Sequence, residues 1–119
     1  MSTLADLASE SFCYLTTTGR VSKNQHTIEI WFALRDRTVY MLAGGRERAH
    51  WVQNIVAEPR VDLRIKDLES EGRGRIVEDP DEEAWAREAL VEKYQPTYSG
   101  DLTNWGRESL PIAIDLDAA

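Results

Sequence analysis

The chain has a single cysteine, Cys13, and only two histidines, His26 and His50, among its 119 residues. One thiol cannot form an intramolecular disulfide, and this sparing use of cysteine is typical of a reducing, cytoplasmic compartment. The two histidines lack the HxxxH or HExxH spacing of a zinc site. We therefore expect a cytoplasmic protein that binds no metal and in which Cys13 is a buried thiol.

Basic residues and long apolar runs are also scarce. The chain has 14 Lys and Arg against 21 Asp and Glu, a formal charge of -7, so its surface should repel nucleic acid and anionic lipid. No stretch approaches the ~20 apolar residues of a membrane helix, and MSTLADLASESF lacks the features of a signal peptide. We expect one domain, residues 1–119, with neither a nucleic-acid partner nor an integral membrane segment.

The usual signatures of hydrolases are missing as well. There is no GxSxG motif, and no arrangement of Ser, His and Asp stands out. The acidic residues between Glu78 and Glu83 lie at a helix start, where the helix dipole already favours them. Acyl transfer and catalysis by a carboxylate pair are therefore not indicated.

Alternating apolar residues predict the strands of a mainly β (α+β) domain. TIEIWFAL (27–34) places its even-numbered residues, all apolar, on one face and Glu29 and Trp31 on the other, which is the two-residue period of a strand. The glycines of EGRGRIVED indicate a bulged or strongly bent strand. The six strands predicted in this way are 12–18, 27–34, 38–42, 61–66, 71–79 and 110–116.

Helical patterns fall between these strands. A short helix is predicted near Leu4 and Leu7, a second from Ala49 to before Pro59, and a third that starts at Asp79 with a cap, a first-turn proline and early acidic residues. Residues 94–106 are predicted as a loop. Mostly local connections between the strands favour a small antiparallel barrel with helices at its rim.

The stretch LAGGRERAHWVQNI (42–55) is the strongest chemical signal. Gly44 and Gly45 allow a ligand to approach the main chain, and the amides of the following helix start are unpaired. Arg46 and Arg48 have the fork geometry that fits phosphate oxygens, although cations at a helix start oppose its dipole. On these residues alone, an anion site and a simple turn with solvated arginines both stay open, and His50 could serve either.

Aromatic residues gather late in the chain. Tyr94, Tyr98 and Trp105 fall within one otherwise polar stretch, where they could cover a flat ring or form a satellite core. Trp31, on the less apolar face of its predicted strand, could line the same space.

The order and spacing of several segments resemble a known family. TTTGR (16–20), EIWFALRDRTVYMLAGG (29–45), WVQNIVAEPRV (51–61) and a late Tyr, Tyr, Trp, LPI pattern resemble the split-barrel flavin and deazaflavin oxidoreductases. More narrowly, the sequence is similar to the deazaflavin (F420)-dependent nitroreductase family from about Phe12 to Leu116. This resemblance implies a six-stranded antiparallel split β-barrel of the FMN-binding type, with two or three peripheral helices.

The resemblance also assigns a cofactor and its site. It implies coenzyme F420, with FMN as the alternative, and it places Trp31 near the strand that binds the ring. Many relatives have a lysine before the glycine pair where this chain has Leu42 and Ala43, so the phosphate clamp must rest on the two arginines. The cofactor-binding residues expected from the resemblance and the motif are Trp31, Gly44, Gly45, Arg46, Arg48, Ala49 and His50.

The implied reaction is hydride transfer from the reduced deazaflavin to a small electron-poor acceptor, such as a quinone, a nitro compound or an activated double bond. Tyr94, Tyr98 and Trp105 would border the acceptor, and Tyr94 or Tyr98 would donate a hydrogen bond to its developing charge. An FMN-dependent oxidoreductase and a non-catalytic barrel that binds a cofactor or lipid are the alternatives. Monomer and homodimer both stay open.

Overall fold

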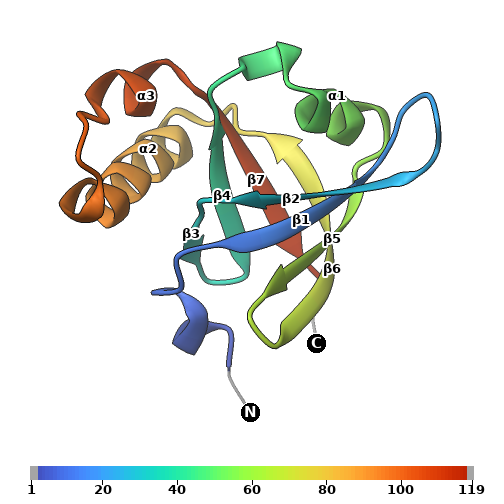
Figure 1. Cartoon of the computed structure of the whole chain (residues 1–119), viewed down its shortest axis with the longest axis horizontal. Coiled ribbons are helices and arrows are strands. Elements are labelled where there is room, and N and C mark those ends of the chain that lie inside the picture. The colour runs from blue at the N-terminus through green and yellow to red at the C-terminus, as the bar shows by residue number, and fades with distance from the viewer. Residues whose placement is uncertain (1–2, 118–119) are drawn as a thin grey trace.

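The computed structural model describes residues 3–117, which form one antiparallel sheet with helices around it (Figure 1). The strands lie in the order β2-β1-β5-β6-β7-β4-β3. Their bounds are β1 (Cys13–Thr18), β2 (Gln25–Ile30), β3 (Ala33–Arg35), β4 (Thr38–Ala43), β5 (Arg60–Ile65), β6 (Leu68–Ile76) and β7 (Leu110–Leu116). The helices are α1 (His50–Ala57), α2 (Pro80–Tyr94) and α3 (Thr103–Glu108), with short 3-10 turns η1 (Ala5–Leu7), η2 (Arg46–Arg48) and η3 (Gln95–Thr97).

The two edge strands of this sheet, β2 and β3, are consecutive in the chain. Only Trp31 and Phe32 separate them, so the sheet must curl until its two edges approach each other. The barrel is closed at this point by the covalent chain, because no ladder of hydrogen bonds joins β2 to β3 within residues 3–117. This is the split β-barrel with peripheral helices that the sequence predicts, built from seven strands in place of six.

The additional strand arises because TIEIWFAL is divided between β2 and β3. The prediction of one continuous strand is wrong, but the prediction of its faces is confirmed. Phe32 is fully buried in the barrel core, the half-buried Ile28 and Ile30 pack against that core, and Trp31 packs against a second cluster. The backbone N–H of Phe32 donates to the Tyr94 hydroxyl (3.0 Å), and Lys93 Nζ donates to the Phe32 carbonyl (2.9 Å). These bonds replace the ladder bonds that a continuous strand would have made.

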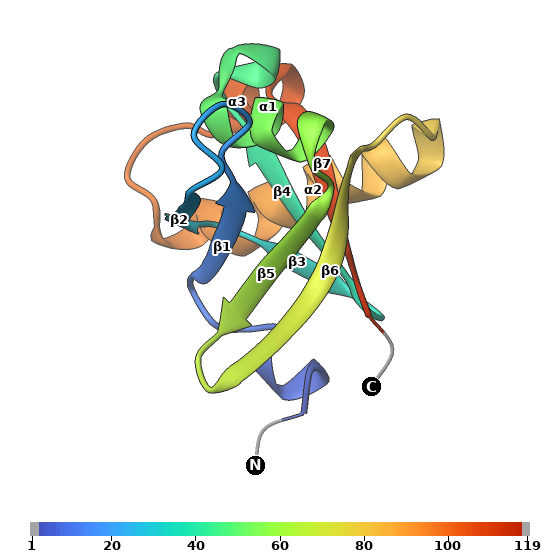
Figure 2. The ribbon, with the colours of Figure 1, turned by 90° about the vertical axis from the view of Figure 1, so that its right-hand side faces the viewer.

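Strand β6 changes its partner halfway along its length, and this is where the sheet curls (Figure 2). Residues 68–73 pair with β5 and residues 72–76 pair with β7 in an uninterrupted register, so the predicted strong bend is present without a gap in the pairing. A Cβ on Gly72 would lie 2.8 Å from the Asp115 carbonyl oxygen, and one on Gly74 would lie 2.7 Å from Ile55 Cγ2. The glycines therefore permit close packing of β7 and α1 against the bend.

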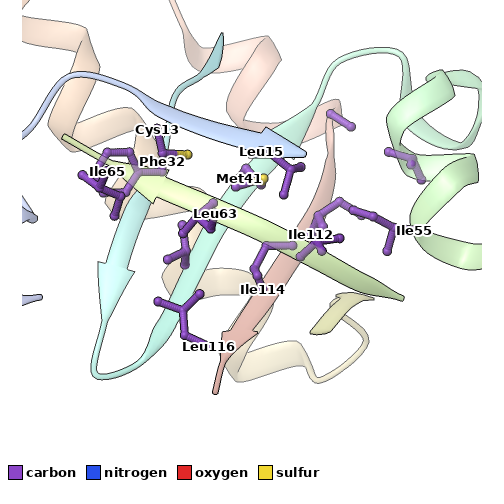
Figure 3. Close-up of a cluster of buried hydrophobic side chains, with 14 of the residues drawn as sticks. Cys13, Leu15, Phe32, Met41, Ile55, Leu63, Ile65, Ile112, Ile114 and Leu116 are labelled. Carbon is purple, nitrogen blue, oxygen red and sulfur yellow. The ribbon is translucent and has the colours of Figure 1, made fainter. Parts of the chain in front are cut away.

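The barrel interior holds the main core (Figure 3). Inward-facing residues of β1, β4, β5 and β7 meet there, in agreement with the alternation of the sequence. The fully or nearly fully buried members drawn in Figure 3 are Cys13, Leu15, Phe32, Met41, Ile55, Leu63, Ile65, Ile112, Ile114 and Leu116. A second cluster lies where α2 covers β4 and β7, and it contains Tyr40, Leu90 and Tyr94.

The helix starts agree better with the sequence than the late segment does. The predicted Asp79 cap is confirmed, because its carboxylate accepts the Glu82 backbone N–H at 2.9 Å. The prediction of a loop over 94–106 is wrong in part, since this segment contains η3 and most of α3. Arg87 of α2 donates to the carbonyls of Gly106 and Ser109, both at 2.8 Å, and so satisfies the end of α3 from outside it.

We predict that Gly74→Ala destabilises the protein by about 1 to 3 kcal/mol, because the new methyl group would overlap Ile55 and neither β6 nor α1 can move freely. Urea denaturation followed by circular dichroism measures the change. Gly44→Ala is the matched control, since its methyl group would lie 3.9 Å from its nearest neighbour, Trp105. Equal stability of the two variants would contradict the proposed close packing.

Candidate functional site

Two open clefts lie next to each other along edge strand β2. In Figure 1 this strand runs from the loop beside α1 toward α2 and α3. Ile28 lines one cleft, of about 900 Å³, and Ile30 lines the other, of about 520 Å³. Thr27 also lines the first cleft and Glu29 the second, so both clefts run along the edge of β2 and not along one face of it. We call them the loop cleft, between the β1–β2 loop and α1, and the aromatic cleft, between β2 and α3.

The loop cleft is organised by Arg20. Its backbone N–H and its Nη1 both donate to Asn54 Oδ1, at 3.2 and 2.9 Å, and its Nη2 lies 3.2 Å from His50 Nδ1. Because a guanidinium group only donates, His50 Nδ1 must accept this bond, which places the proton of the neutral imidazole on Nε2. Asn54 is buried and donates to Thr17 Oγ1 at 3.2 Å, so the carbonyl oxygen that holds Arg20 has a defined orientation.

The charge of the loop cleft is positive. Arg20, His26 and His50 line it, and none of its lining residues within the described chain is a carboxylate. Helix α1 begins at His50 and has no side-chain cap, so the unpaired N–H groups of its first turn add positive potential at the same end. The arrangement suits an anionic group.

Aromatic side chains form the walls of the aromatic cleft. Trp31 stacks on Tyr94 with their ring centroids 4.2 Å apart and their planes within 3°. Tyr98 and Trp105 meet Trp31 edge-on, at centroid distances of 5.7 and 5.6 Å. Trp31, Tyr98 and Trp105 line the cleft, whereas Tyr94 supports Trp31 from behind. The four aromatic residues singled out in the sequence are thus brought together.

The two predicted catalytic tyrosines have different surroundings. Tyr94 is 5% exposed, and its hydroxyl accepts the Phe32 N–H and donates to the Ser11 carbonyl at 2.8 Å. Burial raises the pKa of Tyr94 to about 12. Tyr98 is 47% exposed, and within residues 3–117 its hydroxyl has no hydrogen-bond partner. Only the Tyr98 hydroxyl is therefore available to a ligand without breaking an existing bond.

Two carboxylates also line the aromatic cleft. Glu29 accepts a hydrogen bond from the Tyr14 hydroxyl at 2.8 Å. Asp101 accepts from the backbone N–H and the hydroxyl of Thr103, at 2.9 and 2.6 Å, and these bonds lower the pKa of Asp101.

The glycine and arginine segment lies at the same end of the barrel as α1 and α3 (Figure 2). Arg46 has a φ of 52°, and its guanidinium group bonds the Glu108 carbonyl and lies 3.4 Å from the Glu47 carboxylate. Arg48 is exposed and forms no ion pair within the described residues. Neither arginine lines a cleft, nor do Gly44, Gly45 and Ala49, so their predicted contact with a cofactor stays a prediction.

Sequence reasoning missed the residues that shape the loop cleft. Arg20 is part of the TTTGR segment, yet its role depends on Asn54, which is distant in the sequence. A signal was present, because Asn54 lies four residues after His50 and therefore on the same side of a helix. The carboxylates Glu29 and Asp101 had no such signal. Among residues 3–117, no group of His, Cys, Asp and Glu is placed to hold a metal ion, and no helix is long and apolar enough to cross a membrane.

Solved structures with this fold include two that are described as F420-dependent reductases. A conserved hypothetical protein from Mycobacterium tuberculosis is 18% identical, with a TM-score of 0.76 over 99% of this chain and 82% of the other. A structure described as an F420-H2 dependent reductase is 21% identical, with a TM-score of 0.71 over 91% and 95%. One described as an F420 reductase is 18% identical, with a TM-score of 0.70 over 99% and 96%. At these identities the likeness shows the shared fold.

Sequence comparison identifies the family. No curated protein matches the chain. The model of the F420H2-dependent quinone reductase family matches residues 3–117, which is almost the whole chain, and it decides between F420 and FMN in favour of F420. The chain therefore belongs to the F420H2-dependent quinone reductase family, and it is an F420-dependent oxidoreductase built on a split β-barrel.

Proposed function

We propose that this protein reduces a quinone, or a similarly electron-poor acceptor, in the aromatic cleft, while the cofactor phosphate binds at the loop cleft. The observation that carries the proposal is the contrast between two neighbouring clefts along β2: one is cationic and the other is walled by aromatic rings. A flat ring with a phosphate-bearing tail has the same two chemistries. The family assignment supports a quinone as the acceptor.

Arg20 is the proposed main contact of the phosphate. Asn54 holds its guanidinium group in advance, so binding loses little side-chain entropy. His50 lies beside it and could donate to the same oxygens from Nε2, and the uncapped start of α1 at His50 favours an anion at this end of the helix. Arg48 is exposed just before α1 and can join them without losing an existing partner, whereas Arg46 would first have to leave the Glu108 carbonyl.

The reduced F420 supplies the hydride when it is bound. The protein's own part is to hold the acceptor between β2 and the aromatic walls and to exclude water from it. The Tyr98 hydroxyl is the proposed donor to charge that develops on the acceptor oxygen. Tyr94 acts differently in this proposal, since its hydroxyl is bound to Phe32 and Ser11 and its ring supports Trp31.

The proposed location is the cytoplasm. Cys13 is fully buried, as expected for a thiol that serves as a small apolar core residue in a reducing compartment.

We predict that Arg20→Ala weakens F420 binding by roughly tenfold to a hundredfold, because a charge-assisted contact to phosphate is lost. Titration of the protein with oxidised F420, followed by the fluorescence of the cofactor, gives the dissociation constant. Arg73→Ala removes the same charge from an exposed position of β6 outside both clefts and serves as the control. Wild-type affinity in Arg20→Ala, with affinity lost in Arg46→Ala plus Arg48→Ala, would move the phosphate to the glycine and arginine segment.

We predict that Tyr98→Phe lowers kcat for quinone reduction by about tenfold to a hundredfold while the affinity for F420 stays nearly unchanged. Steady-state kinetics and the F420 titration separate the two effects. Tyr94→Phe should mainly destabilise the fold, by about 1 to 3 kcal/mol, because the Phe32 N–H loses its buried partner. If Tyr98→Phe turns over normally and a stable Tyr94→Phe does not, the two roles are reversed.

A further inference from the structure

The aromatic cleft carries a charge that hydride transfer does not require. Glu29 and Asp101 line it from opposite sides, one on β2 and the other in the loop before α3. Within the described residues, no Lys, Arg or His is among its lining side chains. Any acceptor seated between Trp31, Tyr98 and Trp105 therefore lies near two negative charges and no compensating positive one.

Both carboxylates accept hydrogen bonds, Glu29 from Tyr14 and Asp101 twice from Thr103. Donors directed at a carboxylate stabilise its anion, and those of Thr103 lower the pKa of Asp101. Neither Glu29 nor Asp101 forms a salt bridge within residues 3–117, so no neighbouring cation neutralises them.

The negative charge of the aromatic cleft is local and does not follow from the net charge of the chain. The loop cleft belongs to the same molecule with its formal charge of -7, yet its lining includes Arg20 and His50 and no carboxylate. The two clefts on β2 therefore have opposite electrostatic character. A negative cleft with low-dielectric aromatic walls repels anions and attracts cations over several ångströms.

We propose that Glu29 and Asp101 select acceptors by charge, so that the aromatic cleft admits neutral and cationic aromatic acceptors and disfavours anionic ones. The proposal rests on the proposed function, which places the acceptor in this cleft.

The size of the effect follows from simple electrostatics. Both carboxylates are exposed, so their interaction with a ligand charge about 6 Å away is close to that in water, which corresponds to roughly a threefold change in affinity for each. Because each carboxylate favours the cation about threefold and disfavours the anion about threefold, the two together should change the ratio of cation affinity to anion affinity by roughly eightyfold without salt and by about tenfold at physiological ionic strength. Added salt should reduce this ratio.

The test uses three probes that share a para-substituted nitrobenzene ring and differ in charge: neutral para-nitrobenzyl alcohol, anionic para-nitrobenzoate and cationic (para-nitrobenzyl)trimethylammonium. Nitroaromatic rings quench tryptophan, and Trp31 and Trp105 line the cleft, so quenching gives each dissociation constant without any cofactor. All proteins carry Trp51→Phe, because Trp51 lines the loop cleft and would otherwise report a probe bound there.

Glu29→Gln and Asp101→Asn remove the charges while keeping the hydrogen bonds, since an amide oxygen can still accept from Tyr14 or from Thr103. The double variant should bind the three probes with affinities within about threefold of one another. The matched control is Asp67→Asn plus Glu88→Gln, which removes two exposed carboxylates that line neither cleft.

We expect the parent protein to bind the cation at least tenfold more tightly than the anion, and we expect the matched control to behave like the parent. Equal affinity of the parent for both ions, or discrimination that survives in the double variant, would overturn the proposal. Quinone turnover with F420 is measured separately on the wild-type protein. If the wild-type protein shows no such turnover while the charge discrimination is present, the proposed function is refuted and the charge selection of the cleft stands.

Discussion

The backbone of Phe32 lies outside every strand pair of the sheet, and two side chains of α2 bind it instead. Tyr94 receives its N–H, and Lys93 donates to its carbonyl while its ammonium group lies 3.6 Å from the centroid of the Phe32 ring. Burial lowers the pKa of Lys93 to about 8. The connection between the two edges of the barrel is thereby fixed without a ladder, and Trp31 is presented to the aromatic cleft.

The candidate site depends on this connection between the barrel edges because the parts of the site come from different elements. The β1–β2 loop contributes Arg20, α1 contributes Asn54 and His50, and the segment after α2 contributes Tyr98. What holds them at the correct separation is the packing of the helices on the barrel, including the close approach of α1 to β6 at Gly74. The residues of the candidate site therefore lie at the periphery of the barrel, and the packing of the core sets their relative positions.

The sequence was most informative where the structure is periodic or locally capped. Alternation predicted the strands and the face on which Phe32 lies, and Asp79 with Pro80 marked the start of α2. Local patterns could not reveal that Phe32 would take its partners from α2, or that Arg87 would terminate α3, because these bonds join distant residues. The aromatic cluster was found from composition, whereas Arg20 and Asn54 acquire their role only through contact with each other.

Edge strand β2 offers main-chain groups to a ligand in addition to its side chains. Strand β2 has a ladder partner on one side only, so alternate N–H and C=O groups along its other side are not used within the sheet. The two clefts lie along this strand, and a planar molecule with its own amide-like edge could be bound there by main chain alone. Only a substitution by proline removes such an N–H group. The side chains along this edge can therefore diverge while its main-chain donors and acceptors stay in place.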